Sequence, residues 1–174
     1  MIYESITQLI GNTPLFRPIN FCNSEGAGKD CDILCKLEYL NPAGRIKDRA
    51  ALSMIEEAER RGILKKGSVI IESTSGNTGI GLAAIGASRG YKVILTMPDT
   101  MSIERRRLLA AYGAEIVLTE GALGMKGAID KANELSEITG LPLVLTTVKQ
   151  DLYDDLKGEI QNLFPLKLQK NILI

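Results

Sequence analysis

The residues best suited to chemistry lie in segment 41–49, which reads Asn-Pro-Ala-Gly-Arg-Ile-Lys-Asp-Arg. A Pro-Ala-Gly turn precedes Lys47, and apolar residues then recur at helical spacing, at Ala51, Met54 and Ile55. The spacing therefore predicts that Lys47 stands in the first turn of an amphipathic helix. The positive end of a helix disfavours a cation, and an uncharged amine is the form that condenses with a carbonyl group. Lys47 is a candidate for Schiff-base chemistry, and an ordinary solvated lysine is the alternative.

A second candidate segment, 72–79, reads Glu-Ser-Thr-Ser-Gly-Asn-Thr-Gly and joins a predicted strand to a predicted helix. In open α/β sheets ligands bind at this edge, where free backbone N–H groups and the helix dipole attract anions. Hydroxyl side chains and two glycines favour binding of a carboxylate or a phosphate. The alternative is a loop that only caps its helix. Neither the dinucleotide glycine fingerprint nor the phosphate-loop pattern is present, which disfavours nucleotides.

Composition removes several classes of function. The chain has 174 residues, 45% of them hydrophobic and 24% charged, which suits one globular domain. Basic and acidic residues balance at 21 each, so no net field favours nucleic acid or an anionic membrane. The absence of histidine excludes Ser-His-Asp catalysis and histidine metal sites, and three cysteines are too few for a thiolate zinc site. No metal site is predicted. With no secretory signal pattern and no membrane-length apolar run, we expect a cytoplasmic protein with reduced thiols.

Apolar runs alternate with helical patterns from residue 32 onward. Strands without polar alternation are buried on both faces, and strand–helix alternation favours a parallel sheet. The fold class is therefore predicted as α/β, doubly wound, with a mostly parallel sheet and helices on both faces. Strands are predicted at 32–37, 68–72, 91–97, 115–118 and 141–148, and helices at 47–61, 78–89, 103–112 (N-cap Ser102) and 123–139, the last with Met125, Ala128, Ile129, Ala132 and Leu135 on one stripe.

Two parts of the chain differ in their pattern of apolar and polar residues. Residues 1–148 are predicted to form one α/β domain, and residues 149–174 a divergent tail. One amphipathic helix laid over the sheet edge is one interpretation of the tail, and a poorly ordered end is the other.

Taken together, segments 44–49 and 74–79 resemble the fold-type II pyridoxal-phosphate enzymes, most closely the cysteine synthase (O-acetylserine sulfhydrylase) branch. Segments 10–15 (Ile-Gly-Asn-Thr-Pro-Leu) and 97–102 (Met-Pro-Asp-Thr-Met-Ser) support the resemblance, which runs from about residue 2 to residue 145. Four motifs in the right order make chance agreement improbable. The resemblance implies that the chain forms the N-terminal part of the fold-type II fold.

The resemblance also implies a set of roles. Lys47 would bind pyridoxal 5'-phosphate as a Schiff base and later move the α-proton, and Asn77 would hydrogen-bond the cofactor's 3'-oxygen. The substrate carboxylate would be bound by the loop residues Thr74, Ser75, Gly76 and Thr78. In this family sulfide replaces the acetate of O-acetylserine to give cysteine. The expected partner is a small amino-acid substrate, without nucleic acid or membrane, and the expected assembly is a homodimer or association with a complementary fragment.

Two departures from the family pattern keep alternatives open. Arg45 stands where many members have a small residue, often serine, and nothing after about residue 141 matches the family's glycine-rich phosphate loop. Losing charge-assisted hydrogen bonds of about 1.5–3 kcal/mol each should weaken cofactor binding by orders of magnitude. One hypothesis is a truncated or frame-shifted enzyme of the family, which by ancestry is a transferase or lyase. The alternatives are a catalytically silent domain that keeps the fold and a cystathionine β-synthase-like activity.

Overall fold

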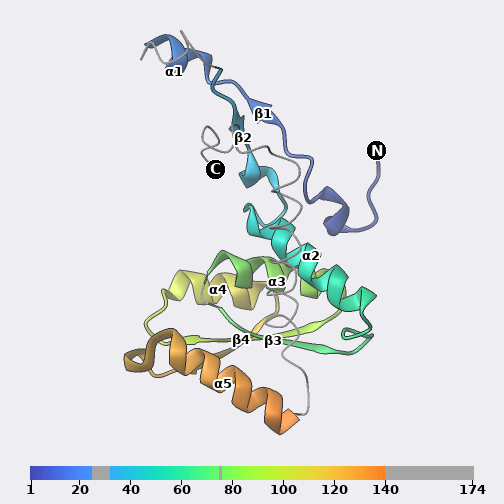
Figure 1. Ribbon diagram of the computed structural model, residues 1–174, viewed down its shortest axis with the longest axis vertical. Helices are drawn as coiled ribbons and strands as arrows, with labels where there is room; N and C mark the ends of the chain where they lie inside the picture. Colours follow the sequence, from blue (N-terminus) through green and yellow to red (C-terminus); the bar gives the residue numbers. More distant parts are fainter. Residues whose placement is uncertain (25–31, 75, 140–174) are drawn as a thin grey trace, which may run out of the picture.

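The computed structural model describes residues 1–24, 32–74 and 76–139. Its body is a parallel sheet in the order β3-β4-β5, formed by Val69–Ser73, Lys92–Pro98 and Glu115–Thr119. Helices α3 and α4 cover one face of the sheet, α2 packs against α3, and α5 covers the other face (Figure 1). The helices span Lys47–Arg60 (α2), Asn77–Ser88 (α3), Ile103–Ala111 (α4) and Gly124–Thr139 (α5). The predicted doubly wound α/β arrangement is confirmed.

The sheet forms the centre of the hydrophobic core. Ile70, Ile71, Leu95 and Met97 on β3 and β4 are completely buried, as expected for strands that are apolar on both faces. The strands pair in register with Ile71 beside Ile94. On the helical side, the apolar stripe of α2 faces the core as its spacing predicted, with Ala51, Ile55 and Ala58 buried.

Glycine on α3 allows α2 and α3 to approach closely. A Cβ atom at position 81 would lie 2.9 Å from Ala51 Cβ and 3.0 Å from the Lys47 carbonyl oxygen. Those separations are shorter than van der Waals contact, so a larger residue would push the two helices apart. Gly81 therefore places the first turn of α2 directly against α3, which matters for the site below.

The N-terminal arm, residues 1–24 and 32–37, is built differently. It contains η1 (Ile6–Leu9), β1 (Leu15–Phe16), α1 (Ile19–Ser24) and β2 (Cys35–Lys36). η1 contacts α3, whereas β1, β2 and α1 project away from the sheet in Figure 1. Strands β1 and β2 pair antiparallel and are exposed. The prediction of a buried strand over 32–37 was therefore wrong. Only two of those residues are in a strand, and they pair with β1 in a separate ribbon rather than with the parallel sheet.

Two further predictions need correction or lie outside the described residues. On α5, Ala128 and Ala132 are buried, but Met125 and Ile129 are 38% and 46% exposed, so the predicted apolar stripe is wider than the face that packs. The predicted strand 141–148 and the tail 149–174 fall outside the part of the chain that the structure describes. Among the residues that the structure describes, no helix is long and apolar enough to cross a membrane.

Short 3-10 turns complete the chain trace. η2 (Glu38–Leu40) connects the arm to the loop before α2, and η3 (Gly121–Leu123) precedes α5. The loop 41–46 therefore lies between the arm and the body, and it leads directly to Lys47.

Candidate functional site

Two loops bring the predicted chemistry together at the starts of neighbouring helices. Lys47 is the first residue of α2 and Asn77 the first of α3, and both side chains are exposed. Arg45, in the loop before Lys47, donates a hydrogen bond from Nη1 to Asn77 Oδ1 at 3.1 Å. This bond joins two loops that are 32 residues apart in sequence. The structure therefore places the candidate lysine and the candidate amide at one end of the packed α2–α3 pair.

The loop before α3 leaves a backbone surface that a ligand can reach. Thr74 Oγ1 accepts a hydrogen bond from the Gly76 N–H at 3.4 Å, and the Gly79 N–H donates to the Gly76 carbonyl at 3.1 Å. A Cβ atom at Gly79 would lie 2.8 Å from Thr74 Cγ2, whereas one at Gly76 would meet nothing within 4 Å. The loop thus packs tightly on the first turn of α3 and is open at Gly76. Thr78 is half-buried, and Ser75 lies outside the described residues.

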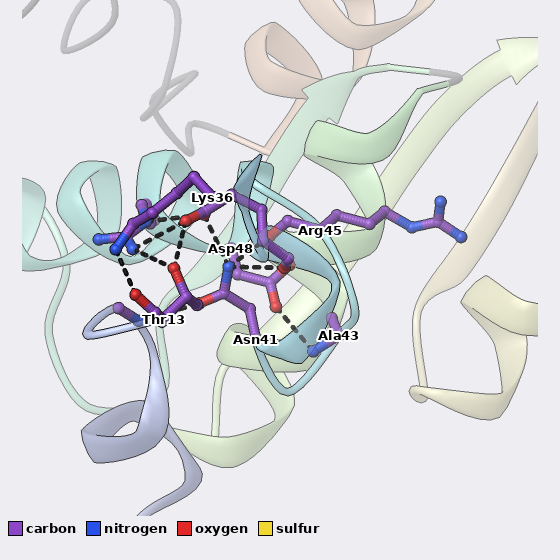
Figure 2. Close-up of polar contacts among 9 residues, drawn as sticks. Thr13, Lys36, Asn41, Ala43, Arg45 and Asp48 are labelled. Atoms are coloured by element: carbon purple, nitrogen blue, oxygen red, sulfur yellow. Dashed lines mark hydrogen bonds and ion pairs between the residues drawn. The ribbon is translucent and has the colours of Figure 1, made fainter. Parts of the chain in front are cut away.

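A cluster of charged and polar side chains fixes the loop that precedes Lys47 (Figure 2). Glu38 accepts hydrogen bonds from Thr13, Asn41 and Arg49 within it. Arg49 binds both carboxylate oxygens of Glu38, from Nε to Oε2 at 2.8 Å and from Nη2 to Oε1 at 2.9 Å. Thr13 Oγ1 donates to Oε1 at 2.6 Å, and Asn41 Nδ2 donates to Oε2 at 2.9 Å. The hydrogen bonds from Arg49 and then Thr13 lower the pKa of Glu38 to about 2, so it is a carboxylate at neutral pH.

Asn41 connects this cluster to both the arm and the loop. Its side chain is buried, and its Oδ1 accepts from the Gly11 N–H at 2.9 Å. Its Nδ2 also donates to the Arg45 carbonyl at 3.2 Å. The Lys36 ammonium donates to the Thr13 carbonyl on the arm side. Segment 10–15, which the sequence identified only as a motif, therefore fastens the arm to the loop that carries Arg45.

Asp48 closes the same loop from inside the helix. The residue is 1% exposed, and its Oδ2 accepts from the Ala43 N–H at 2.7 Å. Burial raises the pKa of Asp48 above its ordinary value. The Asp48 side chain therefore stabilises the loop before Lys47 and is not a solvated carboxylate at the helix end.

Sequence reasoning proposed Lys47 and Asn77 as site residues, and it did not identify the residues that hold the loop before Lys47. Glu38 and Arg49 meet through tertiary structure, and no regular spacing relates Glu38 to Thr13. An Asn-Pro turn start at Asn41 was the available signal, because asparagine side chains commonly bind nearby backbone groups in turns. That signal predicts a turn, but it does not predict which groups the Asn41 side chain binds.

The donors at this end of the molecule suit an anionic ligand that carries a carbonyl group. The residues that carry an exposed amine (Lys47) and an exposed amide (Asn77) begin the two packed helices, next to the N-terminal N–H groups of α3, and the open backbone at Gly76 permits close approach. The fold is that of an α/β protein, and the candidate site lies at the carboxyl end of a parallel strand, the edge where proteins of this class bind ligands. No group of histidine, cysteine, aspartate or glutamate able to hold a metal occurs in the described ranges.

Comparison with known proteins agrees with this class and defines it further. Residues 6–149 match the family described as "Pyridoxal-phosphate dependent enzyme", and the chain belongs to that family. The resemblance to the fold-type II enzymes predicted from four motifs is confirmed.

Several individual proteins are similar to this chain. A cysteine synthase from Flavobacterium sp. is 58% identical over 139 residues, which are 80% of this chain and 44% of that protein. Among solved structures, cysteine synthase from Entamoeba histolytica is 45% identical with a TM-score of 0.75, over 80% of this chain and 41% of that one. O-ureido-L-serine synthase is 43% identical with a TM-score of 0.73, over 81% and 43%. The chain thus spans less than half the length of the relatives it matches.

Proposed function

We propose that this chain takes part in a cysteine synthase-like reaction, in which sulfide replaces the acetate of O-acetylserine, with pyridoxal 5'-phosphate as cofactor. The observation that carries the proposal is the placement of Lys47 and Asn77 at the adjoining starts of α2 and α3, with Arg45 bonded to Asn77. The names of the relatives, cysteine synthases at 45–58% identity, support the same reaction.

The cofactor, when bound, supplies an electron sink for bond breaking next to the amino-acid α-carbon. Lys47 would hold the cofactor aldehyde covalently, and its amine would take the α-proton of the substrate. Asn77 would donate a hydrogen bond from its amide to the 3'-oxygen. The substrate carboxylate would be bound by hydroxyl groups and N–H groups at the start of α3, in the loop of Thr74, Ser75, Gly76 and Thr78.

Assembly and location belong to the same proposal. The protein would act on a small amino acid in the cytoplasm, as a homodimer or together with a complementary fragment. Exposed apolar side chains on the arm, among them Leu15, Phe16 and Phe21, support an additional contact surface.

Reductive trapping tests the role of Lys47. The purified chain is mixed with a low concentration of pyridoxal phosphate, reduced with borohydride and digested, and each lysine peptide is quantified by mass spectrometry. We expect the label to concentrate on Lys47, because it is the first residue of α2 and Asn77, the first residue of α3, lies at the same end of this packed helix pair. Lys47→Ala should lose this label, whereas Lys66→Ala, which removes an exposed lysine on another loop, should keep it. Equal labelling of all exposed lysines would contradict the proposal and favour a catalytically silent domain.

A further inference from the structure

Arg45 departs from the family pattern, and the structure gives this departure a defined contact. Many members have a small residue at this position, whereas Arg45 reaches α3 and donates a hydrogen bond from Nη1 to Asn77 Oδ1 at 3.1 Å. Both residues line a cleft of about 220 Å³ beside α4. A small side chain at position 45 could not extend this far, so the contact with Asn77 depends on the arginine.

The backbone and the side chain of Arg45 are both held in place. Its carbonyl accepts hydrogen bonds from Asn41 Nδ2 and from the Asp48 N–H, each at 3.2 Å. Its Nε is buried, so the base of the guanidinium is packed against protein atoms. Figure 2 shows the side chain pointing away from the Glu38 cluster. Because α2 also packs closely on α3, rigid parts of the fold set the distance between Arg45 and Asn77.

The chemistry of the guanidinium decides which end of the Asn77 amide faces Arg45. A guanidinium carries only donors, so the amide atom that faces it must be the acceptor, Oδ1. The bonds of an amide carbon to oxygen and nitrogen diverge, and Nδ2 with its two N–H donors is therefore turned away from Arg45. A charged donor on the oxygen also polarises the amide, which strengthens Nδ2 as a donor. Asn77 thus presents its donors in one fixed orientation.

We propose that Arg45 is a positioning residue for Asn77, which holds the amide so that Nδ2 donates to the 3'-oxygen of pyridoxal 5'-phosphate. This inference rests on the proposed function, because that function supplies the group that Nδ2 binds. Without Arg45 the amide can rotate by half a turn, and Oδ1 would then present an acceptor to an anionic oxygen, which leaves the hydrogen bond unmade. Arg45 therefore contributes to cofactor affinity without contacting the cofactor.

Affinity for two aldehydes tests this role. The apparent dissociation constant is obtained from the concentration dependence of the borohydride label on Lys47, for pyridoxal 5'-phosphate and for 3-deoxypyridoxal 5'-phosphate, which lacks the 3'-oxygen. We expect Arg45→Met to weaken binding of pyridoxal phosphate by about three- to tenfold. Binding of the deoxy analogue should change by less than about twofold. Arg107→Met is the matched control, because it removes the same charge from an exposed position of α4 that does not line the cleft, and it should change neither constant.

Three outcomes would overturn the inference. Unchanged affinity of Arg45→Met for pyridoxal phosphate would show that the arginine does not contribute to cofactor binding. Equal weakening of both aldehydes would show that Arg45 acts through its charge and not through the 3'-oxygen. In an Asn77→Ala background the effect of Arg45→Met should disappear, because the amide is absent. An effect that persists in Asn77→Ala would show that Arg45 does not act through Asn77.

The orientation of the amide can also be tested without cofactor, so the inference and the proposed function can fail separately. In nuclear magnetic resonance relaxation of the cofactor-free, ¹⁵N-labelled chain, the order parameter of the Asn77 Nδ2 amide should fall from about 0.8 to below about 0.6 in Arg45→Met, and it should not fall in Arg107→Met. This fall without any label on Lys47 would support the orientation by Arg45 and contradict the proposed reaction. Labelling of Lys47 with an amide equally mobile in wild type and Arg45→Met would overturn the inference alone.

Discussion

The α/β body and the N-terminal arm use similar apolar residues with opposite results. In the body, Ile71 and Leu95 are completely buried between helices on the two faces of the sheet. In the arm, Leu15 is 61% and Phe16 51% exposed on a two-stranded ribbon. Apolar character is therefore not enough to bury a side chain. Burial depends on a second layer that covers the strand.

The candidate site lies where these two regions meet. On the body side, the packing of Gly81 against Ala51 and the Lys47 backbone fixes the start of α2. On the arm side, Glu38 and Asn41 fix the loop that carries Arg45. The difference predicts that body substitutions affect global stability most, that the Glu38 cluster affects it less, and that exposed arm residues affect it least.

The largest effect is expected in the body. Leu95→Ala should lower the free energy of unfolding by about 2–5 kcal/mol, because it leaves a cavity in a closely packed core. Urea unfolding followed by circular dichroism measures the change. Leu118→Ala, on the neighbouring strand but 44% exposed, is the control and should cost clearly less. Equal losses for the two variants would show that the sheet is not covered on both faces as described.

An intermediate effect is expected at the junction. Glu38→Gln should lower the free energy of unfolding at pH 7 by about 1–3 kcal/mol, because it removes the charge from hydrogen bonds with Arg49 and Thr13. The same urea experiment measures it, with Glu4→Gln at an exposed position of the arm as control.

The effect of Glu38 should also depend on pH in a defined direction. Its pKa is about 2 in the folded chain, below the ordinary value of 4.5. A lowered carboxyl pKa contributes stability that is fully present above about pH 4.5 and is lost as the pH falls toward about 2. The stability difference between wild type and Glu38→Gln should therefore shrink across this interval. A difference that stays constant from pH 7 to pH 2 would contradict the role of the Glu38 charge.

The smallest effect is expected on the arm. Phe16→Ala should change the free energy of unfolding by no more than about 0.5 kcal/mol, because the side chain is half-exposed. Unfolding is measured at two protein concentrations tenfold apart. A loss above about 2 kcal/mol that grows with concentration would show that the arm is buried between copies of the chain, and the contrast between arm and body would then apply only to the monomer.

Local sequence patterns predicted the body well. The stripe on α2 and the alternation of apolar runs with helical patterns placed α2–α5 and β3–β5 close to their observed bounds. The failures have a common cause. Met125 and Ile129 on α5, like Leu34 next to β2, are apolar but exposed, because a helix or strand buries only the side that another element covers.

The sequence by itself determined the fold class, the family and the presence of a lysine and an asparagine at helix starts, because these follow from periodicity and from motifs within short segments. Only the tertiary structure decided that Glu38 and Asn41 hold the loop before Lys47, and that Arg45 reaches Asn77 beside a cleft. Those contacts join segments that no short-range pattern relates, and their hydrogen bonds form only after the helices pack.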